Sequence, residues 1–410
     1  MPFQLIENRE TKRDADASFL GPDEARKARA YHESFPQYTE TPLVRLHALA
    51  EHTGVQGIYV KDESFRFGLN AFKVLGGSYA IGRYIAERLG IPMQELTNSK
   101  LTSPELRQEL GEITFISATD GNHGRGVAWA ARQLGQKSVI YMPKGSARER
   151  FDNIRREGAD VTITDLNYDD AVRKADEDAR ENGWVLVQDT SWPGYEDIPR
   201  WIMQGYTTLS LEIFEQLGDI KPTHIFLQAG VGSFSSSAAG FFAQAYGKGH
   251  RPVVTIVEPD AADCIFRTMK AADGQLHPVK GDMNTIMAGL ACGEPVTVGI
   301  DVLRGYADYF ISCPDSAAAD GMRILSSPAG EDARIISGES GAAAFGACME
   351  ILMREQLQPL KEKLGIDRHS VLLFISTEGA TDPVNYRNVV WNGAYPWTEC
   401  PGEAASSDFI

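Results

Sequence analysis

The chain has 410 residues, more than one hydrophobic core comfortably serves, and this length favours two domains. Its 56 acidic residues outnumber its 40 basic ones, and the net charge of -16 makes a surface that repels nucleic-acid phosphates and anionic lipid headgroups. The first ten residues contain no apolar signal core, and no apolar stretch approaches the roughly 20 residues of a membrane span. We therefore expect a cytoplasmic protein that has neither nucleic acid nor membrane as a partner.

Short β-rich runs alternate with amphipathic segments along most of the chain. We expect strands at residues 58–60, 113–117, 138–142, 161–164, 185–187, 225–227, 253–257, 309–311 and 371–375. Such alternation predicts an α/β fold with parallel sheets covered by helices on both faces. The capping box Ser146–Glu149 predicts a helix that Gly158 closes, and Asp315 begins another helix.

Lys73 lies among apolar and glycine residues in the segment Phe67–Gly77, where a surface lysine would have polar neighbours. Poor solvation of its ammonium is expected to lower the pKa and free the amine to form a Schiff base with an aldehyde cofactor. Taken alone, the segment also fits a lysine whose charged end reaches water past an apolar stem.

Two glycine-rich segments downstream favour the chemical interpretation. Ser117–Gly126 follows a β-rich run and precedes a helix start, so its turn offers outward-pointing backbone N–H groups as an anion site. Gln228–Ser237 also follows a β-rich run. Its glycines allow the main chain to wrap round a phosphate, and Ser233 adds a hydroxyl.

The order of these motifs resembles the pyridoxal-phosphate enzymes of the tryptophan synthase β-subunit fold type, known as fold type II. The motifs are the lysine after Asn-Ala-Phe, the Gly-Asn-His-Gly turn, the Gly-x-Gly-Ser cup and a late Ser-Thr-x-Gly strand end. Within that group, Asp120–Gly126 and Val257–Cys264 most resemble the diaminopropionate ammonia-lyases. The likeness runs from about Thr41 to about Pro383, and four motifs in order make it specific.

The resemblance implies pyridoxal 5'-phosphate as cofactor, a homodimer and two three-layer αβα domains. No repeat, low-complexity run or linker divides the chain, so the boundaries also come from the resemblance. We expect a small mobile domain at residues 90–195 and a large cofactor-binding domain at residues 1–89 and 196–410.

The resemblance also assigns cofactor contacts. Lys73 carries the cofactor, and Asn122 reaches its ring hydroxyl. Ser376 at the last strand end faces the pyridine nitrogen, with Thr377 as the alternative and a simple strand-ending turn as the non-functional explanation. The phosphate is held by Gly230, Val231, Gly232 and Ser233.

For catalysis, Lys73 freed by the substrate amine is the first candidate base for the Cα proton. Asp120 replaces a small hydroxyl residue of the related dehydratases, and a carboxylate there would face the lysine across the cofactor. Two bases on two faces serve both the D and the L substrate, and an anion favours a cationic side chain. The structural alternative is that Asp120 only caps the helix that begins near Gly124.

Four further residues are assigned to the substrate side. The backbone amides from Thr119 to Gly121 are expected to hold the substrate carboxylate. Tyr168 and Asp189 are expected to line the same region, with Asp189 pairing with an ammonium, although each also fits an ordinary loop residue. His123 is expected to bond locally without a catalytic role.

The five cysteines show neither metal-ligand spacing nor the density of a secreted disulfide scaffold, so we expect no metal site and mostly buried thiols. They are Cys264, Cys292, Cys313, Cys348 and Cys400. Cys264 and Cys292 lie in segments that resemble the family's active-site flanks, so a disulfide between them is left open.

The expected reaction is elimination of ammonia from 2,3-diaminopropionate, giving pyruvate and two ammonia. A serine or threonine dehydratase shares every cofactor contact and is the nearest alternative, and a carrier or sensor of the cofactor is a non-enzymatic one. A nucleotide-binding dehydrogenase fits poorly, because the third glycine of Gly-x-Gly-x-x-Gly would be Ser235.

Overall fold

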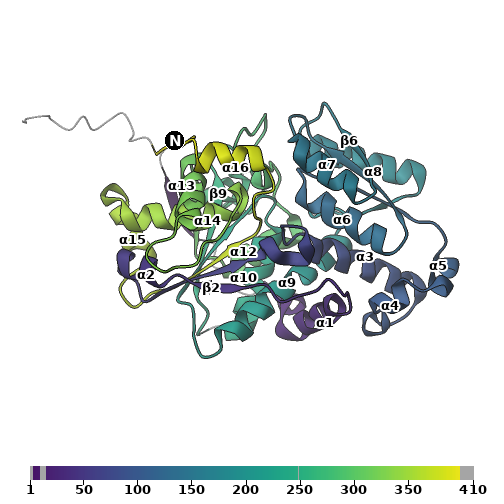
Figure 1. Ribbon diagram of the computed structural model, residues 1–410, viewed down its shortest axis with the longest axis horizontal. Helices are drawn as coiled ribbons and strands as arrows, with labels where there is room; N and C mark the ends of the chain where they lie inside the picture. The colour runs from purple at the N-terminus through teal and green to yellow at the C-terminus, as the bar shows by residue number, and fades with distance from the viewer. Residues whose placement is uncertain (1–2, 10–14, 248, 398–410) are drawn as a thin grey trace, which may run out of the picture.

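This computed structural model describes residues 3–9, 15–247 and 249–397. They contain two β-sheets (Figure 1). Within those residues, the larger sheet has the strand order β1-β10-β9-β8-β11-β3-β2, and the smaller has the order β6-β5-β4-β7. The strands are Gln4–Glu7 (β1), Leu43–Arg45 (β2), Gly57–Asp62 (β3), Thr114–Ala118 (β4), Lys137–Met142 (β5), Asp160–Ile163 (β6), Val185–Leu186 (β7), His224–Gln228 (β8), Val253–Pro259 (β9), Tyr309–Cys313 (β10) and Val371–Ser376 (β11).

Every strand predicted from the sequence is present, and the smaller sheet is parallel throughout. The centre of the larger sheet, from β10 to β3, is parallel as well. Its two edges differ from the prediction, because β1 pairs antiparallel with β10 and β2 pairs antiparallel with β3. Both edge strands are short and only partly buried, so they carry little of the hydrophobic pattern that reveals a strand.

Helices surround both sheets. They are Pro22–Glu33 (α1), His47–Thr53 (α2), Val74–Leu89 (α3), Asn98–Leu101 (α4), Pro104–Leu110 (α5), Asn122–Gln133 (α6), Arg148–Arg156 (α7), Tyr168–Asn182 (α8), Asp197–Leu217 (α9), Ser233–Tyr246 (α10), Cys264–Ala271 (α11), Thr297–Tyr306 (α12), Asp315–Ser326 (α13), Glu339–Met353 (α14), Gln358–Leu364 (α15) and Pro383–Val390 (α16). None of these described helices is long and apolar enough to cross a bilayer.

Strand β11 shows why the larger sheet is covered on both faces. Leu373 and Ile375 belong to the apolar cluster that includes α10, whereas Leu372 and Phe374 belong to the cluster that includes α14. Successive side chains of a strand point to opposite faces, so the uninterrupted apolar run Val371–Ile375 requires a helical layer on each side.

The smaller sheet lies beside the larger one with α6, α7 and α8 around it (Figure 1). Its strands all fall within the predicted small domain at residues 90–195. Helix α6 packs on β4 and β5, α8 packs on the same two strands, and α7 packs on β6. The boundaries and the mobility of this unit stay predictions.

The predicted capping box at Ser146–Glu149 is wrong in detail. Helix α7 begins at Arg148, its N-cap residue is Ala147, and no side chain caps it. Ser146 Oγ instead donates to the carbonyl oxygen of Pro143, which closes a local turn. The other two expectations hold: Gly158, at a φ of +88°, follows the end of α7, and Asp315 begins α13.

Helix α3 connects the two sheets because it packs against both α6 and α9. The contact with α6 depends on Gly126, where an added Cβ would lie 2.8 Å from Val74 Cα. Only glycine permits this approach of the two backbones. Val74 follows Lys73 directly, so the packing of α3 also fixes the position of the lysine.

A buried ionic cluster holds the loop between β3 and α3. Arg66 is fully buried, and its guanidinium donates to Glu63 Oε1 at 2.8 Å and to Glu212 Oε2 at 2.7 Å. Lys61, also fully buried, lies 2.7 Å from the same Glu212 oxygen. The cluster thereby ties the loop that leads to Lys73 to helix α9.

We predict that Glu212→Gln lowers the free energy of unfolding by about 3 kcal/mol, because two buried cations lose their shared anion. Burial by itself raises the pKa of Glu212, but Arg66 and Lys61 outweigh it and lower that pKa to about 2. A carboxyl whose pKa is lowered in the folded state stabilises the fold at pH values above its unfolded-state pKa. The stability difference between wild type and variant is therefore full at pH 7 and becomes smaller as pH falls from about 4.5 toward 2. Denaturant unfolding across this pH range measures it.

Glu215→Gln is the matched control on the same helix, since the Glu215 side chain is 49% exposed and pairs with Arg29. The free energy of unfolding of this variant is expected to stay within about 0.5 kcal/mol of the wild-type value. Equal stability of the two variants at pH 7 would contradict the role assigned to the cluster.

Candidate active site

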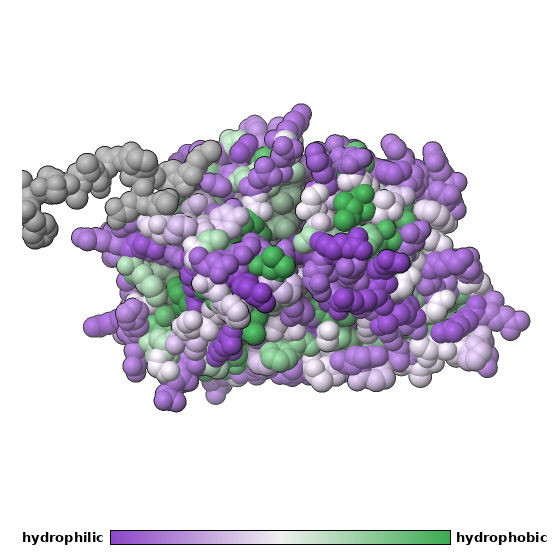
Figure 2. All heavy atoms as spheres, turned by 45° about the horizontal axis from the view of Figure 1, so that its top comes forward, coloured by the Kyte–Doolittle hydropathy of each residue, from purple (hydrophilic) through white to green (hydrophobic). Residues whose placement is uncertain are grey.

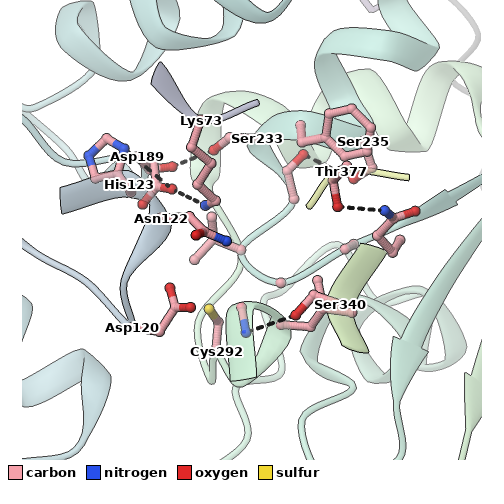
Figure 3. A pocket seen from close by; sticks show the side chains of 18 of the residues that line it. Lys73, Asp120, Asn122, His123, Asp189, Ser233, Ser235, Cys292, Ser340 and Thr377 are labelled. Atoms are coloured by element: carbon pink, nitrogen blue, oxygen red, sulfur yellow. Dashed lines mark hydrogen bonds and ion pairs between the residues drawn. The ribbon is translucent and has the colours of Figure 1, made fainter. Parts of the chain in front are cut away.

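Lys73 lies at the start of α3 and points into a cavity between the two sheets (Figure 3). Its Nζ donates to Asp189 Oδ2 at 2.5 Å, and its side chain is 19% exposed. Burial lowers the pKa of Lys73, but the carboxylate of Asp189, with Tyr206 and Asp120, more than compensates and holds it well above its ordinary value. The lowered pKa expected from the sequence is therefore wrong, because the sequence does not show that Asp189 lies beside the amine.

Asp189 follows the last strand of the smaller sheet and is 1% exposed. Tyr168 Oη donates to its Oδ1 at 3.1 Å, and His123 Nδ1 lies 3.9 Å from its Oδ2. Burial alone raises the pKa of Asp189, but the Lys73 ammonium outweighs it and keeps that pKa well below the usual range. Tyr168 and Asp189 both line the cavity, as the sequence interpretation expected.

His123 bonds locally, as expected. Its Nε2 lies 2.8 Å from the carbonyl oxygen of Val187, and the residue is 1% exposed. Burial lowers the pKa of His123. The imidazole thus packs as a neutral ring between α6 and the end of β7.

Asp120 enters the same cavity from the turn after β4, facing Lys73 from the other side in Figure 3. It does not cap α6, since the N-cap residue is Gly121 and no side chain caps this helix. Its Oδ2 instead accepts from Arg150 Nη1 at 3.2 Å. Burial raises the pKa of Asp120, while Arg150 and Lys73 oppose that rise, so the carboxylate is more basic than an exposed one.

The segment Gly230–Ser233, at the start of α10, forms another part of the cavity wall, and Ser233 Oγ donates to the backbone carbonyl oxygen of Asp189 (Figure 3). Gly232 has a φ of +102°, which favours glycine, and an added Cβ there would lie 2.9 Å from Ile265 Cδ1. Ser236 N–H makes the first bond back to the Gly232 carbonyl oxygen. The amides before it therefore point out of the helix start, which is a ready phosphate site.

The structure contradicts the expected position of Ser376 in the cavity wall. Ser376 does not line the cavity, and its Oγ donates to Ser337 Oγ at 2.8 Å on the other side of β11. Thr377, the alternative, lines the cavity and accepts from Gln228 Nε2 at 2.9 Å. Successive residues of a strand point to opposite sides, so a shift of one position decides which hydroxyl faces the cavity.

The amides from Thr119 to Gly121 are mostly committed elsewhere. Thr119 N–H donates to the carbonyl oxygen of Tyr141 at 2.9 Å, and Gly121 N–H donates to Thr119 Oγ1 at 2.9 Å. Two of the donors assigned to a substrate carboxylate are thus used within the protein, and that expectation does not match this conformation. Thr119 lines the cavity, whereas Gly121 does not.

Asn122 reaches the cavity and donates to Glu378 Oε2 at 2.5 Å. Sequence reasoning missed Glu378, although it stands inside the Ser-Thr-x-Gly motif as the unspecified residue. It also missed Arg150, which is 5% exposed and lies on α7. Neither residue carries a local sequence signal, because the burial of Arg150 and the partners of both side chains are set by the fold.

The described cysteines Cys264, Cys292, Cys313 and Cys348 are buried free thiols. Cys292 lines the cavity, and burial raises the pKa of both Cys264 and Cys292 well above the ordinary value. The structure therefore contains no bond between these two sulfurs. Cys400 lies outside the described residues.

Comparison with known proteins agrees with this geometry. The family model of pyridoxal-phosphate dependent enzymes matches residues 35–364. A diaminopropionate ammonia-lyase from Salmonella typhimurium is 50% identical over 383 residues, covering 92% of this chain and 95% of the relative.

Two crystal structures of the diaminopropionate ammonia lyase from Escherichia coli are similar as well, each 46% identical in sequence. One, in complex with an aminoacrylate-PLP azomethine reaction intermediate, matches with a TM-score of 0.89 over 97% of this chain and 98% of the other. The second, in complex with D-serine, matches with a TM-score of 0.90 over 96% and 98%.

The chain belongs to the diaminopropionate ammonia-lyases, within the pyridoxal-phosphate-dependent enzymes of fold type II. Its cofactor is therefore pyridoxal phosphate. The cavity fits this group, because its wall contains both the Lys73 amine and the glycine-lined start of α10. Tyr206 Oη and Gln228 Oε1 are buried polar atoms of the same wall that have no hydrogen-bond partner among the described residues.

We predict that Gly232→Ala weakens pyridoxal-phosphate binding at least about tenfold, because a Cβ there strains the backbone and moves the amides away from the phosphate. Titration of the apo-protein with the cofactor, followed by absorbance, measures the dissociation constant. Gly247→Ala is the control, since Gly247 follows the other end of α10 with a φ of +75° and open space around it. Unchanged affinity in the Gly232 variant would refute the phosphate assignment.

Proposed function

We propose that the protein eliminates ammonia from 2,3-diaminopropionate in a pyridoxal-phosphate-dependent reaction. Loss of the Cα proton and of the β-amino group leaves aminoacrylate, which tautomerises to an imine that water hydrolyses to pyruvate and a second ammonia. The observation that carries this proposal is the pair of functional groups on two sides of one cavity, with Lys73 opposite Asp120. A serine or threonine dehydratase has no need of the second, acidic group.

When bound, the cofactor acts as an electron sink that makes the Cα proton acidic. Lys73 is the candidate to receive this proton on its own side of the cavity. Its amine is held protonated by Asp189, so it must first give up a proton or its partner must be neutralised before it acts as a base.

Asp120 is the candidate base on the opposite side. Burial raises the pKa of Asp120, while Arg150, at 3.2 Å, opposes that rise and orients the carboxylate. A carboxylate with a raised pKa is a stronger base than an exposed one and is suited to accept a proton. With bases on both sides, the protein can act on either stereoisomer.

We also propose a homodimer in the cytoplasm, built from the two domains predicted above. Support for the dimer comes from exposed apolar side chains at α16. Val384 lies in α16 and Trp391 directly follows this helix, and each is 71% exposed. Sedimentation of the purified protein at micromolar concentration tests the dimer, and a monomer would contradict it.

We predict that the purified holoenzyme releases pyruvate and ammonia from D- and L-diaminopropionate faster than from serine or threonine. The reason is the acidic side of the cavity, which favours a cationic substrate side chain. A coupled assay for pyruvate with each amino acid measures the four rates. Equal or higher turnover of serine or threonine would favour the dehydratase alternative.

Asp120→Asn is predicted to lower kcat for the D isomer by about 10²- to 10⁴-fold, the usual contribution of a positioned base, while the L isomer changes by less than about tenfold. Asparagine keeps the shape of the side chain but cannot accept a proton. Parallel assays of both isomers with pure enzyme measure the two effects. An equal loss for both isomers would contradict the assignment of two bases to two sides.

A further inference from the structure

A second cavity, of about 390 Å³, opens from Asp120 between the smaller sheet and α14. It shares Asp120 and Tyr168 with the cofactor cavity, so the two spaces meet at these residues. Glu339 lines the second cavity, while the adjacent Ser340 lines the first. The second cavity is therefore the compartment next to the reacting centre, on the side of Asp120.

The wall of this cavity carries more negative than positive charge. Its four carboxylates, from Asp120, Asp282, Glu339 and Asp382, stand against two cations, Lys144 and Arg150. Lys144 is exposed to solvent. Arg150 is committed to Asp120 at 3.2 Å and to Thr381 Oγ1 at 3.4 Å, so it does not fully neutralise the acids.

Glu339 is a buried carboxylate with one oxygen left over. It is 1% exposed, and its Oε1 accepts from Asn385 Nδ2 at 2.6 Å. Its Oε2 has no hydrogen-bond partner among the described residues, and the nearest cation, Arg150 Nη2, is 3.8 Å away. An unsatisfied buried carboxylate oxygen is costly, which indicates that a donor from outside the chain completes it.

The surroundings of Glu339 agree with this conclusion. Burial and the neighbouring Glu378 raise the pKa of Glu339 to about 7, against the opposing effect of Arg150. The site thus holds less positive charge than its carboxylates require. A primary ammonium supplies both the missing charge and the missing N–H donor.

We propose that Glu339 is a specificity-determining residue that binds the side-chain ammonium of the amino-acid substrate in the cavity beside Asp120. Asn385 holds one carboxylate oxygen in place and leaves Oε2 to accept from the ligand. This inference rests on the proposed function for the identity of the substrate. It assigns recognition of the second amine to α14, separately from the bases at Lys73 and Asp120.

The test compares two ligands of the same configuration, D-diaminopropionate and D-serine, which differ in a side-chain ammonium or hydroxyl. The holoenzyme and its Glu339→Gln variant are assayed for the KM of D-diaminopropionate, and D-serine binding is measured from the change in cofactor absorbance. The expected result is an about tenfold rise in KM for D-diaminopropionate, the effect of one charge-assisted hydrogen bond, with D-serine affinity within about twofold of the wild type.

Glu149→Gln is the matched control, because it removes one negative charge from α7 beside Arg150. The Glu149 side chain is 42% exposed, pairs with Arg156 and does not line the cavity. It is expected to leave both constants unchanged. The proposal is overturned if Glu339→Gln leaves the ratio of the two constants unchanged, whether both stay constant or both rise together.

If Glu339→Gln does not fold, Asn385→Ala releases the same carboxylate from a partly exposed position on α16. This Asn385 variant must then raise the KM of D-diaminopropionate without lowering the affinity for D-serine. Any other result contradicts the proposal. A wild type that yields no pyruvate from diaminopropionate refutes the proposed function instead. In that case, the dissociation constants of both ligands, measured by cofactor absorbance, still decide the role of Glu339.

Discussion

The buried ion pair between Lys73 and Asp189 is the contact on which the site depends. Lys73 begins α3, which is anchored beside the larger sheet, whereas Asp189 follows β7 of the smaller sheet. Neither charge is tolerated alone in such a position, so the pair forces the ends of the two sheets together. The cavity exists where these ends meet, beyond the carboxyl ends of parallel strands.

Side chains around this ion pair hold its two charged groups in position. Tyr168 bonds to the second oxygen of Asp189, and His123 fills the space behind the carboxylate. On the lysine side, the Arg66 cluster and the close approach of Gly126 to Val74 fix the start of α3. A site that moves one amine between partners needs such rigid supports, because small displacements change the hydrogen bonds that decide protonation.

Much of this architecture was predictable from the sequence. Buried strands are long apolar runs, and glycine-rich turns mark the places where a backbone approaches a ligand, so the parallel strands, the phosphate cup and the lysine all leave local patterns. The antiparallel edge strands β1 and β2 were missed, because short, half-buried strands leave almost no hydrophobic pattern in the sequence. The Gln228–Thr377 contact and the choice of Thr377 over Ser376 depend on which side of a strand end faces inward.

The partners of the charged groups could not be predicted, since they come together from distant parts of the chain. The pKa of Lys73 was expected to fall from burial alone, yet Asp189 reverses the direction. Glu378 and Arg150 were missed for the same reason. Each interacts with an opposite charge that lies nearby only in the folded chain. Desolvation can be inferred from local sequence, whereas ion pairing requires the fold.

The most direct test of this account is to locate the lysine that carries the cofactor. Borohydride reduction of the holoenzyme, followed by peptide mass mapping, marks the amine bonded to the cofactor aldehyde. The account predicts a pyridoxyl label on Lys73 alone. A label on another lysine, such as the fully buried Lys61, or no label at all, would contradict it.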